Sequence, residues 1–557
     1  MFINRALLCL TNGSRAVLSL RISGEIILYG VMLLRALLVS SLINLFLIDV
    51  TLFSTEGIPV LVGVTLLIVI EFIINYVNQV ISIRTGIRIK SKIREDLLNG
   101  ILTLGPAYVN KKRSGNLITS FLSKIEAIEP YYTVYLPNGI ATIFWAIVVI
   151  SYLCTINIYV SLTCLVGILI VLLAPNIWGK LMYKFGEEDW SLMSKFQSEM
   201  MDNLQGMSTL KVFQMGDTRG KLMETLAWKI HGKTMEQLSV TQVESGVLIV
   251  GAYLGSSMSV GVAIWQSLLG NVEVNQLVTV FFLITACFAP AFTLIDTWHL
   301  GYHGMTASPS VLELLNDAKD AGIVKQSAQT KSVNNYQGSV EVEFANVSFE
   351  YEQEEPVLHN ISFSIPQGQK VALVGKSGSG KSTIINLISG FYEPTQGEIT
   401  VNGAPVDWHD FRTAMGIVWQ EPYLFYGTIG DNICFGLENV SKEDMVKAAK
   451  MANIHDFIKE LPLGYDTLVR ERGMRLSGGE KQRIAIARCF LHDPQFLIFD
   501  EATSNLDIDN EDIIRESMEQ LLEGRTALLI AHRLSTIKNV DQVYVLEKGR
   551  INATIHS

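Results

Sequence analysis

The sequence is short of charge. Asp, Glu, Lys and Arg make up 18% of its 557 residues, whereas about a quarter is usual for a soluble domain. The deficit lies before residue 300, and residues 130–179 contain none of these four residue types. A net charge of −10 supplies no basic surface, so no nucleic-acid partner is expected. Six cysteines without a C-x-x-C pair argue against a disulfide framework or a zinc site.

What the first half has instead is long apolar runs, each able to cross a hydrocarbon core of about 30 Å. Residues 130–179 are too many for one span and predict two helices with a turn near Asn157. The pattern therefore predicts six spans, which are 26–48, 58–81, the two within 130–179, 245–271 and 274–295.

The stretches around the spans predict the topology. The loops 49–57 and 270–275 and the turn near Asn157 contain no Lys or Arg, whereas 83–129 and 180–244 are rich in both. By the positive-inside rule, the chain is expected to be a multi-pass protein of the cytoplasmic membrane with both termini in the cytoplasm. The two charged stretches are expected to be long cytoplasmic helices, and residues 1–24 are expected to form an amphipathic helix on the membrane surface.

Four polar residues in or near the spans leave alternatives open. Arg35 and Glu71 fall inside predicted spans, where an unpaired charge is costly, so they either pair with each other or line a cavity for a polar substrate. His299 and His303 are spaced i, i+4. They could ligate a metal or haem, or they could be interfacial residues at the end of the sixth span.

Composition also predicts the domain limits. Residues 1–318 form the expected transmembrane domain, and 319–338, rich in Lys, Gln, Ser and Asn, form the expected linker. From residue 339 to 557 the composition is that of a soluble α/β domain. Its first strands are expected at Val340–Phe344 and Val347–Tyr351. The fold class expected for the chain is a six-helix all-α transmembrane domain followed by an α/β nucleotide-binding domain.

A glycine-rich motif carries the strongest chemical signal. Residues 375–382, GKSGSGKS, follow the apolar run 371–374 and precede a helix-like run, the context that a phosphate loop requires. Its backbone N–H groups and the helix N-terminus suit an anion. Lys381 can reach the β- and γ-phosphates of a nucleotide, and the Ser382 hydroxyl can ligate Mg²⁺. The candidate nucleotide-binding residues here are Gly375, Ser377, Gly378, Ser379, Gly380, Lys381, Ser382 and Thr383.

Two carboxylates follow a second apolar run. Residues 496–499 are Phe-Leu-Ile-Phe, and Asp500 and Glu501 come next. Asp500 is suited to hold Mg²⁺, and Glu501 is suited to polarise an attacking water. The candidate catalytic residue is thus Glu501, and the candidate metal ligands are Ser382 and Asp500.

The segment Leu476-Ser477-Gly478-Gly479-Glu480 precedes a strongly helical run and offers a second anion site at a helix N-terminus. With this segment, the sequence resembles the ATP-binding cassette (ABC) transporters, whose signature is L-S-G-G-Q/E. The resemblance covers essentially the whole chain and is most specific over 340–550. It implies that ATP and Mg²⁺ are the cofactors.

The resemblance assigns roles to further residues. Tyr351 resembles the aromatic residue that stacks on adenine, and Gln420 resembles the loop glutamine that senses Mg²⁺. His532 resembles the switch histidine that contacts the γ-phosphate and joins Glu501 as a catalytic candidate. Residues 471–473 resemble the short segment before the signature that contacts the coupling helices of the membrane domain. Residues 504–507 match the D-loop of the family, with Asn505 where alanine is usual.

The resemblance also implies a dimer. The phosphate loop and the signature of one cassette cannot face the same nucleotide. Each ATP is therefore expected between Lys381 of one chain and Ser477, Gly478, Gly479 and Glu480 of the other. Six spans are half of the twelve typical of exporter-type members, so the expected partner is a second half-transporter.

Residues 129–137 are similar to the Cyd-type heterodimeric exporters, which are associated with thiol or haem-linked export. That similarity implies a small-molecule substrate and a different, homologous partner chain. Two alternatives stay open. One is an exporter-fold importer of iron–siderophore complexes or haem, and the other is a membrane-anchored regulatory ATPase that moves nothing.

Overall fold

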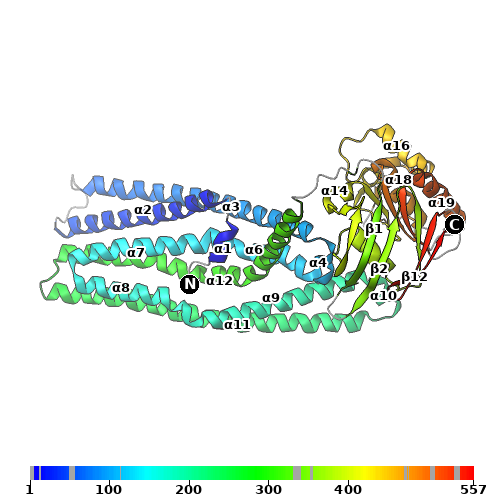
Figure 1. Ribbon diagram of the computed structural model, residues 1–557. Coiled ribbons are helices and arrows are strands. Elements are labelled where there is room, and N and C mark those ends of the chain that lie inside the picture. The colour runs from blue at the N-terminus through cyan, green and yellow to red at the C-terminus, as the bar shows by residue number, and fades with distance from the viewer. Residues whose placement is uncertain are drawn as a thin grey trace. The chain divides into compact units, whose positions relative to one another are not determined.

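The computed structural model divides the chain into two compact units, Met1–Ile323 and Val324–Ser557. Figure 1 shows a unit of long helices and a unit of strands and shorter helices. The structure describes residues 5–11, 14–48, 57–112, 114–329, 336, 340–351, 355–469, 473, 476–501, 508–531 and 540–556. Each unit is described by itself.

The first unit consists of helices joined by short turns, and its described residues contain no strand. Its elements are α1 Arg5–Leu10, α2 Arg15–Ile48, α3 Gly57–Leu104, α4 Pro106–Lys111, α5 Ser114–Thr119, the π-helical turn η1 Ser120–Lys124, α6 Ile125–Pro130, the π-helical turn η2 Tyr131–Tyr135, α7 Leu136–Ile156, α8 Ile158–Leu173, α9 Pro175–Gln205, α10 Met207–Val212, α11 Gly216–Leu268 and α12 Val274–Gln329. Six helical stretches in the described residues are long and apolar enough to cross a membrane, which confirms the six predicted spans.

Two local features explain how the spans fold back and pack. The predicted turn lies at Asn157, whose side chain accepts hydrogen bonds from the backbone N–H groups of Tyr159 and Val160 at the start of α8. Helices α8 and α11 then approach through glycine, because a Cβ atom on Gly255 would lie 2.8 Å from the Cα of Gly167. Small residues allow such close packing. It matters in a membrane because lipid is as apolar as the helices, so van der Waals contact rather than the hydrophobic effect holds them together.

The prediction of a separate surface helix over 1–24 is wrong for its second half. Helix α2 begins at Arg15 and continues without a break into the first span. Arg21 is buried, forms an ion pair of 2.5 Å with Glu25 one turn later and donates to the carbonyl of Thr133. Because Glu25 neutralises the charge of Arg21, this part of α2 can stay within the helix bundle. Helix α12 likewise runs on to Gln329, so residues 319–329 of the expected linker are helical.

The segment that resembles the Cyd-type exporters forms part of the core of this unit. Tyr131, Tyr132 and Tyr135 in η2 are almost fully buried. The hydroxyl of Tyr132 donates to the carbonyl of Leu7 at 2.6 Å, which ties α1 to η2. A Cβ atom on Gly301 would collide with the ring of Tyr135, so α12 also packs closely here. The tyrosines are therefore packing residues.

The second unit contains two larger sheets (Figure 1). A four-stranded sheet has the order β2-β1-β4-β5, and a six-stranded sheet has the order β12-β11-β3-β10-β9-β6. Strands β11, β3, β10, β9 and β6 are parallel, and β12 is antiparallel at the edge. The strands are β1 Val342–Glu350, β2 Pro356–Ile365, β3 Lys370–Val374, β4 Gln396–Val401, β5 Ala404–Pro405, β6 Met415–Val418, β7 Gly427–Thr428, β8 Leu468–Val469, β9 Phe496–Asp500, β10 Thr526–Ala531, β11 Gln542–Glu547 and β12 Arg550–His556.

The helices of this unit lie between its strands in the sequence. They are α13 Lys381–Ile388, α14 Trp408–Thr413, α15 Ile429–Ile433, α16 Lys442–Met451, α17 His455–Glu460, the 3₁₀ turn η3 Gly464–Asp466, α18 Gly478–His492 and α19 Ile508–Leu522. Successive residues of a strand point to opposite faces. Phe496 and Ile498 of β9 accordingly pack in one apolar cluster, and Leu497 and Phe499 pack in another. Both faces of the parallel sheet are therefore buried.

One strand prediction needs a correction. The two strands expected at 340–344 and 347–351 form the single strand β1. An irregularity between Phe344 and Val347 separates its two halves, and Asn346 there has a φ of 52°. Asparagine tolerates this left-handed conformation better than most residues, so the strand can continue through it.

Candidate functional site

The phosphate loop connects β3 to α13 at the carboxyl end of the parallel sheet. Gly378 and Gly380 have φ values of 79° and 108°, a region that favours glycine. A Cβ atom on Gly375 would lie 2.3 Å from the carbonyl oxygen of Leu546. Glycine is thus required at these positions for the loop to curl against β11.

Lys381 lies at the first position of α13 and is 6% exposed. Its ammonium donates to the carbonyl oxygens of Gly375 at 2.8 Å and Lys376 at 3.1 Å, inside the loop itself. Burial lowers the pKa of Lys381, and the carboxylates of Glu501 and Asp500 oppose that shift. The lysine is therefore held at the loop, within electrostatic range of both carboxylates.

The hydroxyl residues of the loop have different surroundings. Ser382 is exposed, whereas Ser379 and Thr383 are 5% exposed. The Ser379 hydroxyl is buried with no hydrogen-bond partner in the described residues. Thr383 Oγ1 accepts a hydrogen bond of 3.2 Å from the hydroxyl of Tyr351. Ser377 is exposed as well, so the hydroxyls of Ser377 and Ser382 are the two in this loop that an incoming ion can reach.

Asp500 is the last residue of β9, two strands from β3 in the same sheet, and Glu501 follows it. Burial raises the pKa of Asp500, and the Glu501 charge raises it further, while Lys381 lowers it. Glu501 has a φ of 46°, and its N–H donates to the carbonyl of Ile530 at 3.1 Å. A non-glycine residue in this left-handed region stores strain, of the kind often found at functional sites.

Gln420 follows β6, the neighbour of β9. Its side-chain amide donates to Oε2 of Glu501 at 3.2 Å, so the structure brings together two residues that are 81 positions apart. Gln482 of α18 donates to the backbone carbonyls of Trp419 and Gln420 at 3.0 and 2.8 Å. Sequence reasoning missed Gln482. The sequence shows only a glutamine two positions after Glu480, and the burial of that amide is seen in the structure alone.

The signature segment forms the N-terminus of α18. Ser477 and Glu480 make a reciprocal capping box, in which Ser477 N–H donates to Glu480 Oε2 at 2.7 Å and Glu480 N–H donates to Ser477 Oγ at 3.3 Å. This cap leaves the N–H groups of Gly478 and Gly479 at the first positions of the helix, where no intrahelical acceptor exists. Within the described residues, no hydrogen bond or ion pair joins this segment to the phosphate loop.

Tyr351 follows β1 and is 45% exposed. Its ring lies edge-on to Phe349 and Tyr392, with centroids 4.8 and 5.1 Å away. Its hydroxyl accepts from Asn386 at 3.2 Å. These contacts orient the ring beside α13 while leaving much of it exposed. Three further predicted elements, His532, residues 471–472 and residues 504–507, lie outside the described residues.

The polar residues of the helical unit show two different arrangements. Arg35 of α2 and Glu71 of α3 form an ion pair of 3.3 Å, which favours the first of the two alternatives open for them. His299 is exposed, whereas His303 stacks on Trp190 with centroids 5.2 Å apart. No group of three or more metal-ligating side chains occurs in the part of the chain that the structure describes. The histidines therefore have no ligand set around them there.

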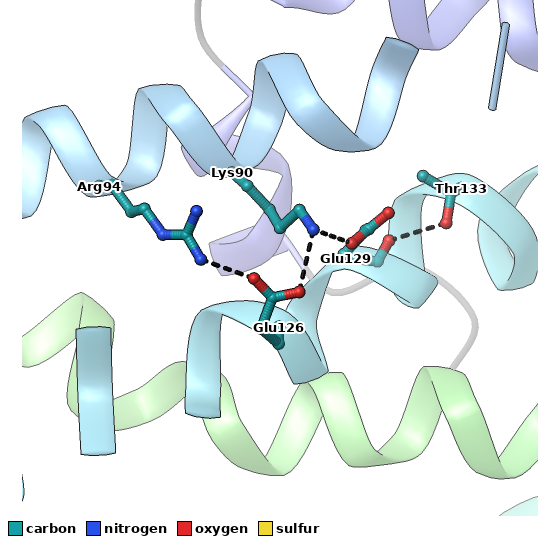
Figure 2. Close-up of polar contacts among 5 residues, drawn as sticks. All are labelled: Lys90, Arg94, Glu126, Glu129 and Thr133. Atoms are coloured by element: carbon teal, nitrogen blue, oxygen red, sulfur yellow. Dashed lines mark hydrogen bonds and ion pairs between the residues drawn. The ribbon is translucent and has the colours of Figure 1, made fainter. Parts of the chain in front are cut away.

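A cluster of charges joins α3 to α6 (Figure 2). Lys90 forms ion pairs with Glu126 at 2.9 Å and Glu129 at 2.6 Å, and Arg94 pairs with Glu126 at 2.6 Å. A Cβ atom on Gly86 would lie 2.2 Å from a carboxylate oxygen of Glu129, so the glycine makes room for this contact. Every charge in the cluster has a partner, which indicates that these ion pairs stabilise the packing of α3 against α6.

The comparisons with known proteins match both units. The ABC transporter transmembrane region family matches residues 24–291, and the ABC transporter family matches residues 358–504. A protein of Staphylococcus aureus strain NCTC 8325, named as a multidrug export ATP-binding/permease protein, is 30% identical over 540 residues. The alignment covers 95% of this chain and 92% of that protein. A protein of the same description from S. aureus strain bovine RF122 has the same identity and coverage.

A solved structure described as a bacterial Atm1-family ABC exporter with ATP bound is also similar. It has 26% sequence identity and a TM-score of 0.85, and the match covers 97% of this chain and 96% of that one. The predicted fold class is confirmed, and so is the multi-pass membrane character. The chain belongs to the ABC transporter family, as a half-transporter in which an exporter-type transmembrane domain is joined to an ATP-binding domain that couples ATP to transport.

Proposed function

We propose that this chain is one half of a dimeric pump that hydrolyses ATP with Mg²⁺ to move a small molecule across the cytoplasmic membrane. The observation that carries the proposal is the meeting of Lys381, Gln420, Asp500 and Glu501 at the carboxyl ends of neighbouring parallel strands and their loops. Ligands of open α/β sheets bind at such ends. The proposed domain limits are 1–318, 319–338 and 339–557, with both termini in the cytoplasm.

Each of these residues has a proposed task. Lys381 and the loop N–H groups hold the β- and γ-phosphates, and the exposed face of Tyr351 stacks on the adenine. Ser382, Gln420 and Asp500 offer oxygen atoms of the type that Mg²⁺ prefers. The bound ion would neutralise phosphate charge. Glu501, held by Gln420, orients and polarises the attacking water, while His532 contacts the γ-phosphate.

The geometry of the signature supports a second cassette. The N–H groups at the start of α18 need an acceptor, and the described contacts provide none from the phosphate loop of the same chain. We propose that Ser477, Gly478, Gly479 and Glu480 face the ATP held by the Lys381 loop of a partner half-transporter. ATP then joins the two cassettes, and hydrolysis separates them.

The substrate is the finer part of the proposal. The likeness of residues 129–137 to the Cyd-type exporters supports a heterodimer for thiol or haem-linked export. The names of the S. aureus relatives, which mention multidrug export, support instead a drug-like cargo. The structure of the tyrosine segment weakens the first reading, because its residues are buried in the core. An importer of iron–siderophore complexes or haem remains the transport alternative.

A flux experiment tests the proposal. The chain is reconstituted in proteoliposomes, alone and with a homologous half-transporter from the same organism. ATP-dependent flux of glutathione, cysteine, haem, an iron chelate and a cationic dye is then measured. Flux that requires both ATP and Glu501 supports a pump, and its direction separates export from import. ATP hydrolysis without flux of any of these compounds would support the rival function, a membrane-anchored regulatory ATPase.

A further inference from the structure

The transmembrane unit contains a cavity of about 590 Å³ between η1 with the adjoining α5, and helices α9 and α12. Its volume is within the range of about 300–1,000 Å³ usual for small-molecule sites. It lies in the charged helical extensions, whereas the nucleotide residues all belong to the other unit. No role described so far uses it.

Close helix contacts bracket the cavity along α9. Near one end, a Cβ atom on Gly186 would lie 2.6 Å from a methyl carbon of Thr306 of α12. At the other end, a Cβ atom on Gly115 of α5 would lie 2.0 Å from the hydroxyl of Ser198. Between these contacts the helices leave space that is lined by Ser191, Ser194 and other polar residues. The cavity is therefore framed by tight packing, which makes it a defined space.

A lysine of η1 lines this cavity without a carboxylate partner. Lys124 Nζ donates to Ser310 Oγ at 2.6 Å and lies 5.9 Å from the centre of the Trp190 ring, both neutral groups. Within the described residues, no Asp or Glu oxygen lies within 4.0 Å of this ammonium. The nearby carboxylate of Glu313 pairs with Lys112 at 2.9 Å.

The other charged residues of the cavity do not provide Lys124 with a carboxylate partner. Lys112 and Glu313 also line it and form an ion pair with each other. Lys195 and Glu187 line it too, but both are exposed and of opposite sign. Lys124 is half-buried, and a partly desolvated cation gains more from an anion than an exposed one does. Its position in a π-helical turn fits this reading, since such turns occur frequently at functional sites.

The wall of the cavity also has an aromatic face. Tyr183 lines it and is 43% exposed. Trp190 is different, because it is only 8% exposed and is held by His303 on its ring and by Thr306 on its indole N–H. Trp190 therefore positions Lys124, while Tyr183 offers a surface on which a flat apolar group can lie.

We propose that this cavity binds a small organic anion that has a flat apolar part. Lys124 holds the anionic group, and Tyr183 contacts the apolar part. The proposal concerns binding alone and depends on neither the nucleotide site nor the direction of transport. It can therefore be tested on the full chain without nucleotide.

Three probes of one shape provide the test. The full-length chain in lipid nanodiscs is dialysed to equilibrium against 2-naphthoate, 2-naphthamide or 2-naphthylmethylammonium, with empty nanodiscs as the blank for partition into lipid. We expect saturable binding of the carboxylate and at least about tenfold weaker binding of the other two, the factor expected for loss of one hydrogen bond to a charged group. Equal binding of the three probes, or no saturable binding of 2-naphthoate, would overturn the proposal.

Variants then identify the residue. Lys124→Gln is expected to weaken 2-naphthoate binding at least about tenfold, and Lys124→Arg is expected to retain most of it. Lys229→Gln is the matched control, because Lys229 is an exposed lysine of α11 that does not line the cavity. Unchanged binding in Lys124→Gln would refute the assignment. Because the probe comparison uses the unmodified chain, it decides the matter even if Lys124→Gln does not fold.

Discussion

Replacing Glu501 by glutamine tests the proposed chemistry most directly. The change swaps one carboxylate oxygen for an NH₂ group and keeps the shape of the side chain. The remaining oxygen can still accept the hydrogen bond from Gln420, which is 3.2 Å in length. The backbone bond to Ile530 is unaffected, because it uses the N–H group of residue 501. The variant should therefore fold and bind ATP as the unmodified chain does.

The expected loss lies in the chemical step. A positioned general base contributes about 10²–10⁴ to a rate. At 1.36 kcal/mol per factor of ten, this is about 3–5 kcal/mol of transition-state stabilisation. An amide cannot take up the proton of the attacking water. We therefore expect Glu501→Gln to lower the rate constant for ATP hydrolysis by two to four orders of magnitude and to leave the affinity for ATP nearly unchanged.

The assay measures phosphate release under single-turnover conditions, with ATP binding measured separately. It is done with the chain as a homodimer, or with the equivalent carboxylate of a partner also changed, so that an intact second site does not mask the effect. Glu516→Gln in α19 is the control, because Glu516 is an exposed carboxylate of the same unit. Full hydrolysis by the Glu501→Gln homodimer would refute the role given to this residue.

Three further predictions concern Asp500, Tyr351 and Lys90. Without nucleotide and Mg²⁺, Asp500→Asn should raise the melting temperature at pH 7. Burial and the Glu501 charge raise the pKa of Asp500 in the folded chain. The stability that the protonated side chain contributes is full below its ordinary pKa and is lost as the pH rises through its folded pKa. At pH 7, asparagine therefore removes the cost of holding an ionised carboxylate at this position. The gain should vanish below about pH 4, and a lower melting temperature at pH 7 would contradict this. Tyr351→Ala should weaken ATP binding about 5- to 150-fold, the range for loss of one stacked base, and Tyr351→Phe should not; equal affinities in a binding titration would remove the stacking role. Lys90→Met should lower the melting temperature of the detergent-solubilised chain by about 1–2 °C, the shift for loss of about 1 kcal/mol in a unit of this size, whereas Lys92→Met, which loses ion pairs only within α3, should lower it less.

The parts of the fold that the sequence predicted are those set by local pattern. Apolar length determines a membrane span, so the six spans and the turn at Asn157 were found from the sequence. The phosphate loop was placed correctly between a strand and a helix, because both its glycines and its neighbours have strong local preferences. Where each helix ends was less predictable. Charge suggested a surface helix at 15–24, but the Arg21–Glu25 ion pair compensates that charge inside the bundle.

Contacts between distant residues could not be predicted in this way. Gln420 and Glu501 meet only because β6 and β9 are neighbours in the sheet, and strand order is not written in any single segment. Gln482 was missed for the same reason, since its partners lie in the loop after β6. The left-handed conformation of Glu501 is also a property of its surroundings, because glutamate has no local preference for it.

The two opposite charges of the nucleotide site, Lys381 and Asp500, influence each other without forming an ion pair in the described residues. Lys381 donates to two backbone carbonyls of its own loop, and in the described residues it forms no ion pair with Asp500. Their pKa values nevertheless move in opposite directions from the ordinary ones, and burial is the main cause of both shifts. A buried cation and a partly buried carboxylate that interact without forming an ion pair keep much of the cost of their desolvation. Phosphate oxygens near Lys381 and a cation near Asp500 would each reduce that cost, so the folded domain is prepared for a ligand that carries both charges.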